Sequence, residues 1–157
     1  VPLIANWPGK IREGRKTSDL VDASDFFPSL ADLAGVKLAN NRPVDGISFV
    51  PSLLDQAGRK REWCFFWYDP RPGWDKDRFS RSIFALDHNY KLFSDGRLFD
   101  IRGEEMRESQ LRLGDLGSKA LQAKNKLKKA IAKAMKGPIS NQAMKVVDAF
   151  GNPLPSL

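Results

Sequence analysis

The chain contains little of two residue types that often carry chemistry: one cysteine and one histidine among 157 residues. A single cysteine excludes a disulfide within the chain and leaves the redox compartment undecided. Cys64 lies beside several aromatic residues, and the general behaviour of free cysteine predicts a buried apolar side chain. His88 stands between Asp87 and Asn89, without the second ligand of a metal site or the partners of a catalytic triad, so we expect a turn residue.

Long apolar runs are also missing from the sequence. No stretch of eighteen apolar residues occurs, so no membrane span is predicted. There is no signal-peptide pattern, which says nothing about export if other residues precede Val1. Residues Leu3–Trp7 are typical of a buried strand that ends at a Pro-Gly turn. Because a core strand needs neighbours and the chain lacks an initiating methionine, we expect the C-terminal fragment of a larger α/β protein.

Acidic residues are absent from residues 116–147, although the whole chain carries 26 basic and 19 acidic side chains. Eight lysines fall in this stretch, which leaves 18 basic and 19 acidic groups elsewhere. The net charge of +7 is therefore a property of one segment. The eight are Lys119, Lys124, Lys126, Lys128, Lys129, Lys133, Lys136 and Lys145.

Within that segment, Ser118–Lys136 has apolar residues near helical spacing, and Gly137-Pro138 is a stop signal. The pattern predicts an amphipathic helix whose apolar stripe packs on the body of the protein while its lysines face water. The alternative is a polyanion-binding face for sulfated polysaccharide, nucleic acid or an anionic membrane, because clustered lysines attract anions. Since aromatic stacking platforms are missing, we expect no specific nucleic-acid partner.

Two helices are predicted in the first part of the chain. Residues Asp25–Ala34 form the first, with Asp25 as N-cap and Gly35 as stop, and place Phe26, Leu30 and Leu33 on one face. A shorter helix is expected over Phe49–Gln56. A polar connector follows it, so we predict domains at 1–58, 59–136 and a tail at 137–157.

The second part of the chain is predicted to form an antiparallel sheet, because four of its segments are rich in aromatic and β-branched residues. Asp95-Gly96 lies where a tight hairpin turn is needed. We therefore predict an α/β protein, α+β within the fragment: the end of a large mixed-sheet domain, then a small four-stranded antiparallel sheet packed with a C-terminal helix. The predicted strands are Glu62–Tyr68, Ser80–Leu86, Tyr90–Phe93 and Leu98–Ile101.

Several short patterns resemble, in the same order, those of the formylglycine-dependent sulfatases. Val1–Lys10 is similar to the family's "VPLIV-WPG" strand, and Asp19–Gly35 to its "S-x-DLLPTLLDLAG" helix. Arg42–Pro51 is similar to the "DG-x-S-LLPLL" turn. Trp63–Tyr68 and Tyr90–Asp100 look like the family's C-terminal hairpins, written "YKL…G-LYDL". The resemblance extends over about the first 112 residues and implies the α/β scaffold of that superfamily.

The resemblance implies hydrolysis of a sulfate ester, by attack of a hydrated formylglycine on sulfur with calcium stabilising the developing charge. In the family, the nucleophile matures from a C-x-P-x-R or S-x-P-x-R pattern, and it and the calcium ligands precede the strand that opens this chain. Cys64 is followed by Phe65–Tyr68, which provide neither the proline nor the arginine. We therefore expect no catalytic residue, metal ligand or bound cofactor in this chain.

The same resemblance implies the partners. Ca²⁺ and formylglycine are expected in an N-terminal catalytic portion of the same protein, which would act on a sulfated saccharide or an aryl sulfate in the periplasm or outside the cell. Phosphonate and phosphodiester hydrolases share the scaffold and remain an alternative. Two further alternatives remain: a non-catalytic polyanion-binding module, and a domain with no activity of its own.

One segment is a candidate for contact with substrate. The charged stretch Asp69–Arg78 joins two predicted strands and is too long for a minimal hairpin turn. Because the corresponding connection can border the active-site cleft in the family, the resemblance implies that Arg71, Trp74 and Lys76 bind an anionic or sugar substrate. The alternative is structural, with Arg71 paired to a neighbouring aspartate and Trp74 covering the sheet edge.

Overall fold

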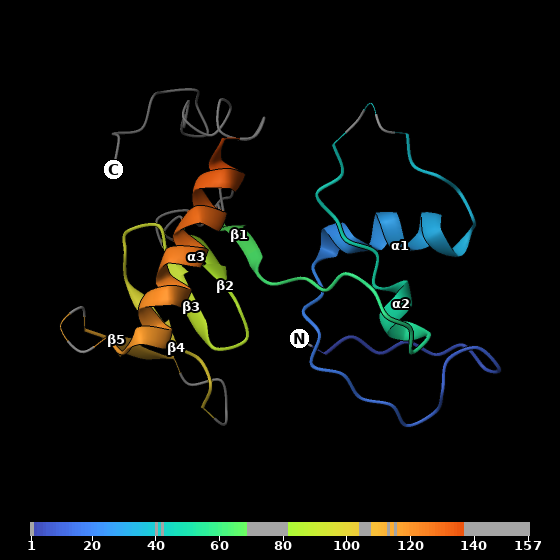
Figure 1. The fold of residues 1–157 in the computed structure, drawn as a ribbon, viewed down its shortest axis with the longest axis horizontal. Coiled ribbons are helices and arrows are strands. Elements are labelled where there is room, and N and C mark those ends of the chain that lie inside the picture. Colours follow the sequence, from blue (N-terminus) through green and yellow to red (C-terminus); the bar gives the residue numbers. More distant parts are fainter. Residues whose placement is uncertain are drawn as a thin grey trace, which may run out of the picture. The chain divides into compact units, whose positions relative to one another are not determined.

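The computed structural model describes residues 2–39, 41, 43–68, 82–103, 108–112, 114 and 116–136. The chain divides into two compact units, Val1–Cys64 and Phe65–Leu157 (Figure 1). The finer domain limits drawn from the sequence stay a prediction. Among the described residues, no helix is both long enough and apolar enough to cross a membrane.

The first unit contains the two predicted helices, each shorter than expected. A 3-10 turn, η1 (Ala23–Asp25), leads into α1 (Phe26–Leu33), and α2 spans Val50–Leu53. Gly35 ends α1 with a φ of 66°, while the Gly35 and Val36 amides donate to the carbonyls of Asp32 and Ala31. This pair of hydrogen bonds is the Schellman motif, so the predicted stop is confirmed.

The N-terminal cap of this helix differs from the prediction. Asp25 makes no side-chain cap to α1; Asp22 instead accepts from the Ser24 amide at 2.9 Å, and Asp25 accepts from the Asp22 amide at 2.8 Å. The two aspartates form a capping box around η1. The Asp25 carboxylate also accepts hydrogen bonds from other segments of the unit, in addition to the one from Asp22.

The predicted strand Leu3–Trp7 is wrong for this chain. These residues form neither helix nor strand, and their apolar side chains are exposed, Ile4 by 88%. A strand requires a hydrogen-bonded neighbour, and within the described part of this unit we find strand pairing only as an isolated bridge between Leu20 and Arg61. The predicted turn does form, because the Trp7 carbonyl accepts from the Lys10 and Ile11 amides.

The apolar face of α1 forms as predicted but stays largely uncovered by the described residues of its own unit. Phe26, Leu30 and Leu33 are exposed, Leu30 by 63%. Phe26 meets Phe49 edge to face, with ring centroids 5.3 Å apart. The buried residue of α1 is Ser29, so the helix side that carries Ser29, and not the centre of the apolar face, packs against its unit.

The second unit is a five-stranded sheet in the order β1-β2-β3-β4-β5, with antiparallel pairing from β2 to β5. The four predicted strands are confirmed with slightly different ends, and β5 was not predicted. Ser109 and Gln110 in β5 are exposed and lack the alternation that marks a strand. The strands are β1 (Cys64–Tyr68), β2 (Ser82–Leu86), β3 (Tyr90–Phe93), β4 (Leu98–Asp100) and β5 (Ser109–Leu111).

The hairpin between β3 and β4 turns at Asp95-Gly96, as the sequence predicts. Gly96 has a φ of 92°, which favours glycine, and its amide donates to the Phe93 carbonyl at 3.0 Å. The Phe93 amide in turn donates to Arg97 at 2.9 Å. This turn sets the register in which Leu92 lies opposite Leu98.

The core of this unit lies between the sheet and α3 (Ser118–Met135), which contacts β2 and β3 (Figure 1). Leu127 is fully buried in α3, and three alanines beside it are buried as well. Ala85 and Leu92, opposite each other in the sheet, are also buried. The predicted amphipathic helix packed on the sheet is therefore confirmed.

The other face of the sheet carries a row of aromatic rings. Phe84 and Phe93 alternate with Ala85 and Leu92, so they point away from α3. Phe66 stacks on Phe84 at 4.9 Å between centroids, and the Lys91 ammonium lies 4.2 Å from the centre of the Phe84 ring. The aromatic content that predicted these strands thus serves cross-strand contacts.

Candidate functional site

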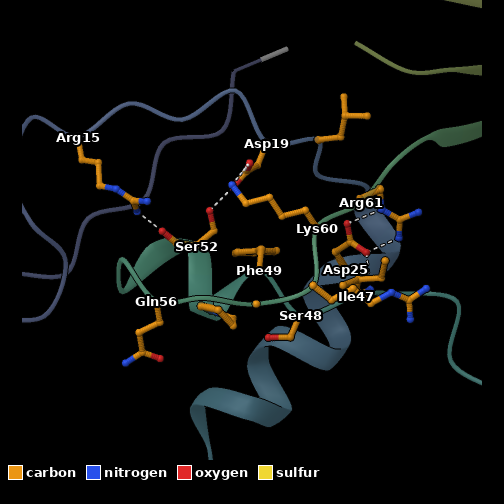
Figure 2. Close-up of a pocket in the computed structure, with 14 residues that line it drawn as sticks. Arg15, Asp19, Asp25, Ile47, Ser48, Phe49, Ser52, Gln56, Lys60 and Arg61 are labelled. Carbon is orange, nitrogen blue, oxygen red and sulfur yellow. Dashed lines mark hydrogen bonds and ion pairs between the residues drawn. The ribbon is translucent and has the colours of Figure 1, made fainter.

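A small polar pocket of about 50 Å³ lies in the first unit, between the segment before η1 and the segments on either side of α2 (Figure 2). Charged side chains from distant positions of the unit meet here. The charged residues that line it are Arg15, Asp19, Asp25, Arg59, Lys60 and Arg61.

The Asp25–Arg61 ion pair is the most buried contact of the pocket. Its side chains are 2% and 9% exposed, respectively. The Arg61 guanidinium donates two hydrogen bonds to Asp25, through Nε at 2.8 Å and through Nη2. The carboxylate also accepts from the Ile47 amide at 2.6 Å, so it joins three segments of the chain.

Burial is the largest influence on the Asp25 carboxyl and raises its pKa, but the hydrogen bonds outweigh it. Donation by Arg61 and by the Ile47 and Asp22 amides leaves the pKa of Asp25 below its usual value. The same pair raises the pKa of Arg61, chiefly through its hydrogen bonds to Asp25. Asp25 is therefore a fixed anion at neutral pH.

Close backbone packing surrounds this ion pair. The Ser29 hydroxyl donates to the Asp25 carbonyl at 2.6 Å and accepts from the Phe49 amide at 3.0 Å. A side chain at Gly46 would collide with the backbone of Ser24 and the ring of Pro28. Position 46 thus requires glycine because the backbone of η1 passes directly against it.

A second group of polar contacts completes the pocket. Lys60 Nζ lies 2.8 Å from Asp19, the Ser52 hydroxyl donates to Asp19, and Arg15 donates to the Ser52 carbonyl. The pKa of Asp19 is lowered, first by the hydrogen bond from Lys60 and next by that from Ser52. Figure 2 shows these side chains converging from the loop before η1, from α2 and from the connector after it.

The pocket is built to hold chain segments together and is too small for a sugar. Sites for drug-sized ligands measure several hundred Å³, whereas about 50 Å³ accommodates a few water molecules. Arg15, Lys60 and Arg61 are already paired with Asp55, Asp19 and Asp25. The arrangement therefore stabilises the unit and leaves these cations little capacity for an additional anion.

Sequence reasoning missed this network. The sequence predicts a helix cap at Asp25 and a polar connector at Ala57–Arg61, yet Asp25 and Arg61 meet across 36 positions. The available signal was the spacing of Asp19, Asp22 and Asp25 against the basic run Arg59–Arg61. Charge complementarity between such distant segments does not identify which acid meets which base.

The predicted substrate-binding residues Arg71, Trp74 and Lys76 lie outside the described residues. Cys64 is buried as predicted, and burial raises the pKa of its thiol to about 11. His88 is an exposed residue between β2 and β3, which confirms the turn. In the described ranges, no three histidine, cysteine or acidic side chains gather in a way that could hold a metal ion.

Asp87 ties α3 to the turn that joins β2 and β3. Its carboxylate accepts from the Asn89 and Tyr90 amides, both at 2.9 Å, and lies 2.5 Å from Lys126 Nζ. Burial raises the pKa of Asp87, but the hydrogen bonds from Lys126 and the two amides lower it further, so the net direction is down. Lys126 is thus a structural lysine, unlike its neighbours on α3.

Comparison with known proteins identifies a family for these two units. The model of the family described as "N-sulphoglucosamine sulphohydrolase, C-terminal" matches residues 1–136. Mouse steryl-sulfatase is 34% identical over 68 residues, which cover 43% of this chain and 11% of that protein. Rat arylsulfatase G is 38% identical over 47 residues, which cover 30% of this chain and 9% of that protein.

A solved structure gives a further comparison. It is described as BT4656 in complex with its substrate D-glucosamine-2-N,6-O-disulfate, and it aligns with a TM-score of 0.44 and 14% identity. The alignment covers 71% of this chain and 23% of that one. The chain therefore spans about a tenth of the curated relatives above and about a quarter of this structure.

Proposed function

Because the chain belongs to the N-sulphoglucosamine sulphohydrolase C-terminal family, we propose that it is the C-terminal part of a sulfatase that hydrolyses sulfate esters. The family match over residues 1–136 carries this proposal. The similarity to steryl-sulfatase and arylsulfatase G supports the same reaction class. Phosphonate or phosphodiester hydrolysis finds no comparable support, since the relatives named above are sulfatases.

We propose that the formylglycine and the calcium of such an enzyme are supplied by residues outside this sequence. Cys64 does not fit the formylglycine, and among the described residues no group of acidic side chains fits the calcium. Cys64 is 3% exposed, its raised pKa keeps it as a thiol at neutral pH, and the proline and arginine of the maturation pattern are missing after it. We therefore assign no catalytic step to the described residues.

The contribution of this chain to the enzyme would be structural support and substrate contact. The Asp25–Arg61 ion pair holds together distant segments of the first unit, and the five-stranded sheet forms the body of the second unit. We propose an N-terminal catalytic portion as the partner, sulfated saccharides or aryl sulfates as substrates, and a periplasmic or secreted location for the enzyme.

The test of this function uses the longer reading frame that contains the chain. We expect it to encode a C-x-P-x-R or S-x-P-x-R pattern upstream, and its purified product to hydrolyse an aryl sulfate in the presence of calcium. The 157-residue chain, assayed in parallel, should show the rate of the buffer alone. Turnover by the short chain that survives repurification, or no turnover by the matured long product on any sulfate ester, would overturn the proposal.

Arg71 provides a finer test of substrate contact. We propose that its guanidinium binds a sulfate or carboxylate of the saccharide through paired hydrogen bonds, while Trp74 stacks on a sugar ring and Lys76 adds charge. In the complete enzyme, Arg71→Ala should lower kcat/KM for a sulfated saccharide about ten- to a hundred-fold, mainly through KM. A small aryl sulfate should be affected far less, because it does not extend to this segment.

The control for that experiment is stability. Melting temperatures of the parent enzyme and Arg71→Ala should agree, and Arg78→Ala in the same charged stretch provides a matched loss of one guanidinium. Equal losses on both substrates, or a clearly lower melting temperature, would place Arg71 in a structural ion pair.

A further inference from the structure

The outer surface of α3 carries an unusual concentration of positive charge on a firmly placed helix. Its inner side is fixed by buried Ala120, Ala123, Leu127 and Ala130, which pack toward β2 and β3. The remaining sides are rich in lysine and, from 116 to 136, contain no acidic residue. Two rows of lysines, Lys124/Lys128 and Lys129/Lys133/Lys136, run along this exposed half of the helix, and we call them together the α3 lysine face.

These lysines are accessible, and none of them forms an ion pair with another described residue. Four of them are exposed and Lys124 is half-buried. Among the ion pairs of the described residues, α3 contributes the one between Lys126 and Asp87, which leaves the lysine face without a carboxylate partner. Lys126 therefore serves the fold, while the lysine face makes no such contribution.

The spacing of the lysine face is unfavourable for the helix itself. Lys124 and Lys128 are four positions apart, as are Lys129 and Lys133, and like charges at that spacing repel each other. The helix dipole favours Lys133 in the last turn but gives no comparable gain to Lys124 or Lys128 in the middle. An extended anion lying along the helix would relieve this repulsion.

We propose that the α3 lysine face binds a sulfated polysaccharide chain. From Lys124 to Lys136 the face extends about 18 Å along the helix, at 1.5 Å per residue, which suits a polymer with repeated charges better than a single anion. The helix contains no aromatic residue for base stacking and no arginine for paired hydrogen bonds to bases. Lysine binds anions as a point charge, which matches sulfates on a flexible glycan.

The choice of a sulfated glycan over other polyanions rests on the proposed function, because a sulfatase that acts on saccharides meets such polymers. The lysine face would hold the polymer by charge alone. Binding should therefore depend little on which sugars make up the polymer, should require their sulfate groups, and should weaken steeply as the salt concentration rises.

The test compares two variants with the same net charge. The first replaces Lys124, Lys128, Lys129 and Lys133 by glutamine; the second replaces Lys10, Lys16, Lys37 and Arg59, exposed cations of the first unit, by glutamine. Both variants carry four charges fewer than the +7 of the parent chain. Circular dichroism should show both folded, since the replaced residues are solvated or half-buried.

Affinity for heparin, for desulfated heparin and for duplex DNA is measured by salt elution and titration near physiological ionic strength. We expect the parent to bind heparin and the lysine-face variant to lose affinity about tenfold or more, while the first-unit variant changes by about twofold at most. Desulfated heparin should bind no better than the lysine-face variant binds heparin. Equal losses in both variants, no parent binding, or DNA binding as tight as heparin would overturn the proposal.

This binding test is separate from the test of turnover. If the lysine face binds heparin but the matured long product has no sulfatase activity, the proposed function is contradicted. Aryl-sulfate turnover together with no heparin binding would remove the polysaccharide surface and leave the proposed function intact.

Discussion

Asp25→Ala is expected to destabilise the first unit by about 3–5 kcal/mol, because it leaves the buried Arg61 guanidinium without its counter-charge. The Ile47 amide, which donates to Asp25 at 2.6 Å, loses its acceptor in the same variant. Urea unfolding followed by tryptophan fluorescence should report the loss, and hydrogen exchange at the Ile47 amide should assign it to this unit.

Asp32→Ala is the matched control, since Asp32 is an aspartate of α1, the helix that follows Asp25, but is exposed and accepts a hydrogen bond from the Ser48 hydroxyl at the surface. We expect a loss below about 1 kcal/mol for it. The double variant Asp25→Ala/Arg61→Ala should lose less than the two single losses combined, because neither charge is then left unpaired. Additive losses would contradict the buried-pair interpretation.

The pH dependence of stability follows from the direction of the Asp25 shift. A carboxyl whose pKa is lowered by folding stabilises the protein above its unfolded pKa, near 4, and loses that contribution as pH falls through the folded value. The parent should therefore lose stability steeply below about pH 4. Asp25→Asn, which cannot ionise, should show a shallower acid dependence in the same unfolding measurement.

Leu127→Ala is expected to destabilise the second unit by about 2–5 kcal/mol. Leu127 is fully buried between α3 and the sheet, and the alanines around it cannot expand to fill the space left behind. Loss of helical circular dichroism with urea measures the effect.

Leu121 offers a control on the same helix, because it is 49% exposed. Leu121→Ala removes the same atoms and should change stability by less than about 0.5 kcal/mol. Equal midpoints for the two variants would mean that Leu127 is not part of the core.

The sequence predicted the sheet of the second unit well because its signals are local. Tyr90–Phe93, the Asp95-Gly96 turn and Leu98–Asp100 follow one another, so the alternation, the turn and the pairing all lie within eleven residues. The end of α1 was equally local, since Gly35 alone provides the left-handed backbone that stops the helix.

The errors arose where structure depends on distant partners. Leu3–Trp7 has the composition of a strand, but pairing requires a neighbour that the described residues do not provide. Strand β5 has few of the aromatic and β-branched residues that are typical of strands, and it forms because the edge of β4 offers it a hydrogen-bonding partner. The Asp25–Arg61 pair combines both difficulties, because each residue had a plausible local role and the real one spans 36 positions.

The same contrast in contact range sets an order of folding. Strands β2, β3 and β4 each pair with the strand that follows in the chain, whereas the first unit is closed by contacts such as Asp19–Lys60, 41 positions apart. Closing long loops costs entropy before any contact repays it, so local pairings form sooner. We expect strands β2 to β5 to form the early folding nucleus of this chain, and the first unit with its Asp25–Arg61 and Asp19–Lys60 ion pairs to be completed last.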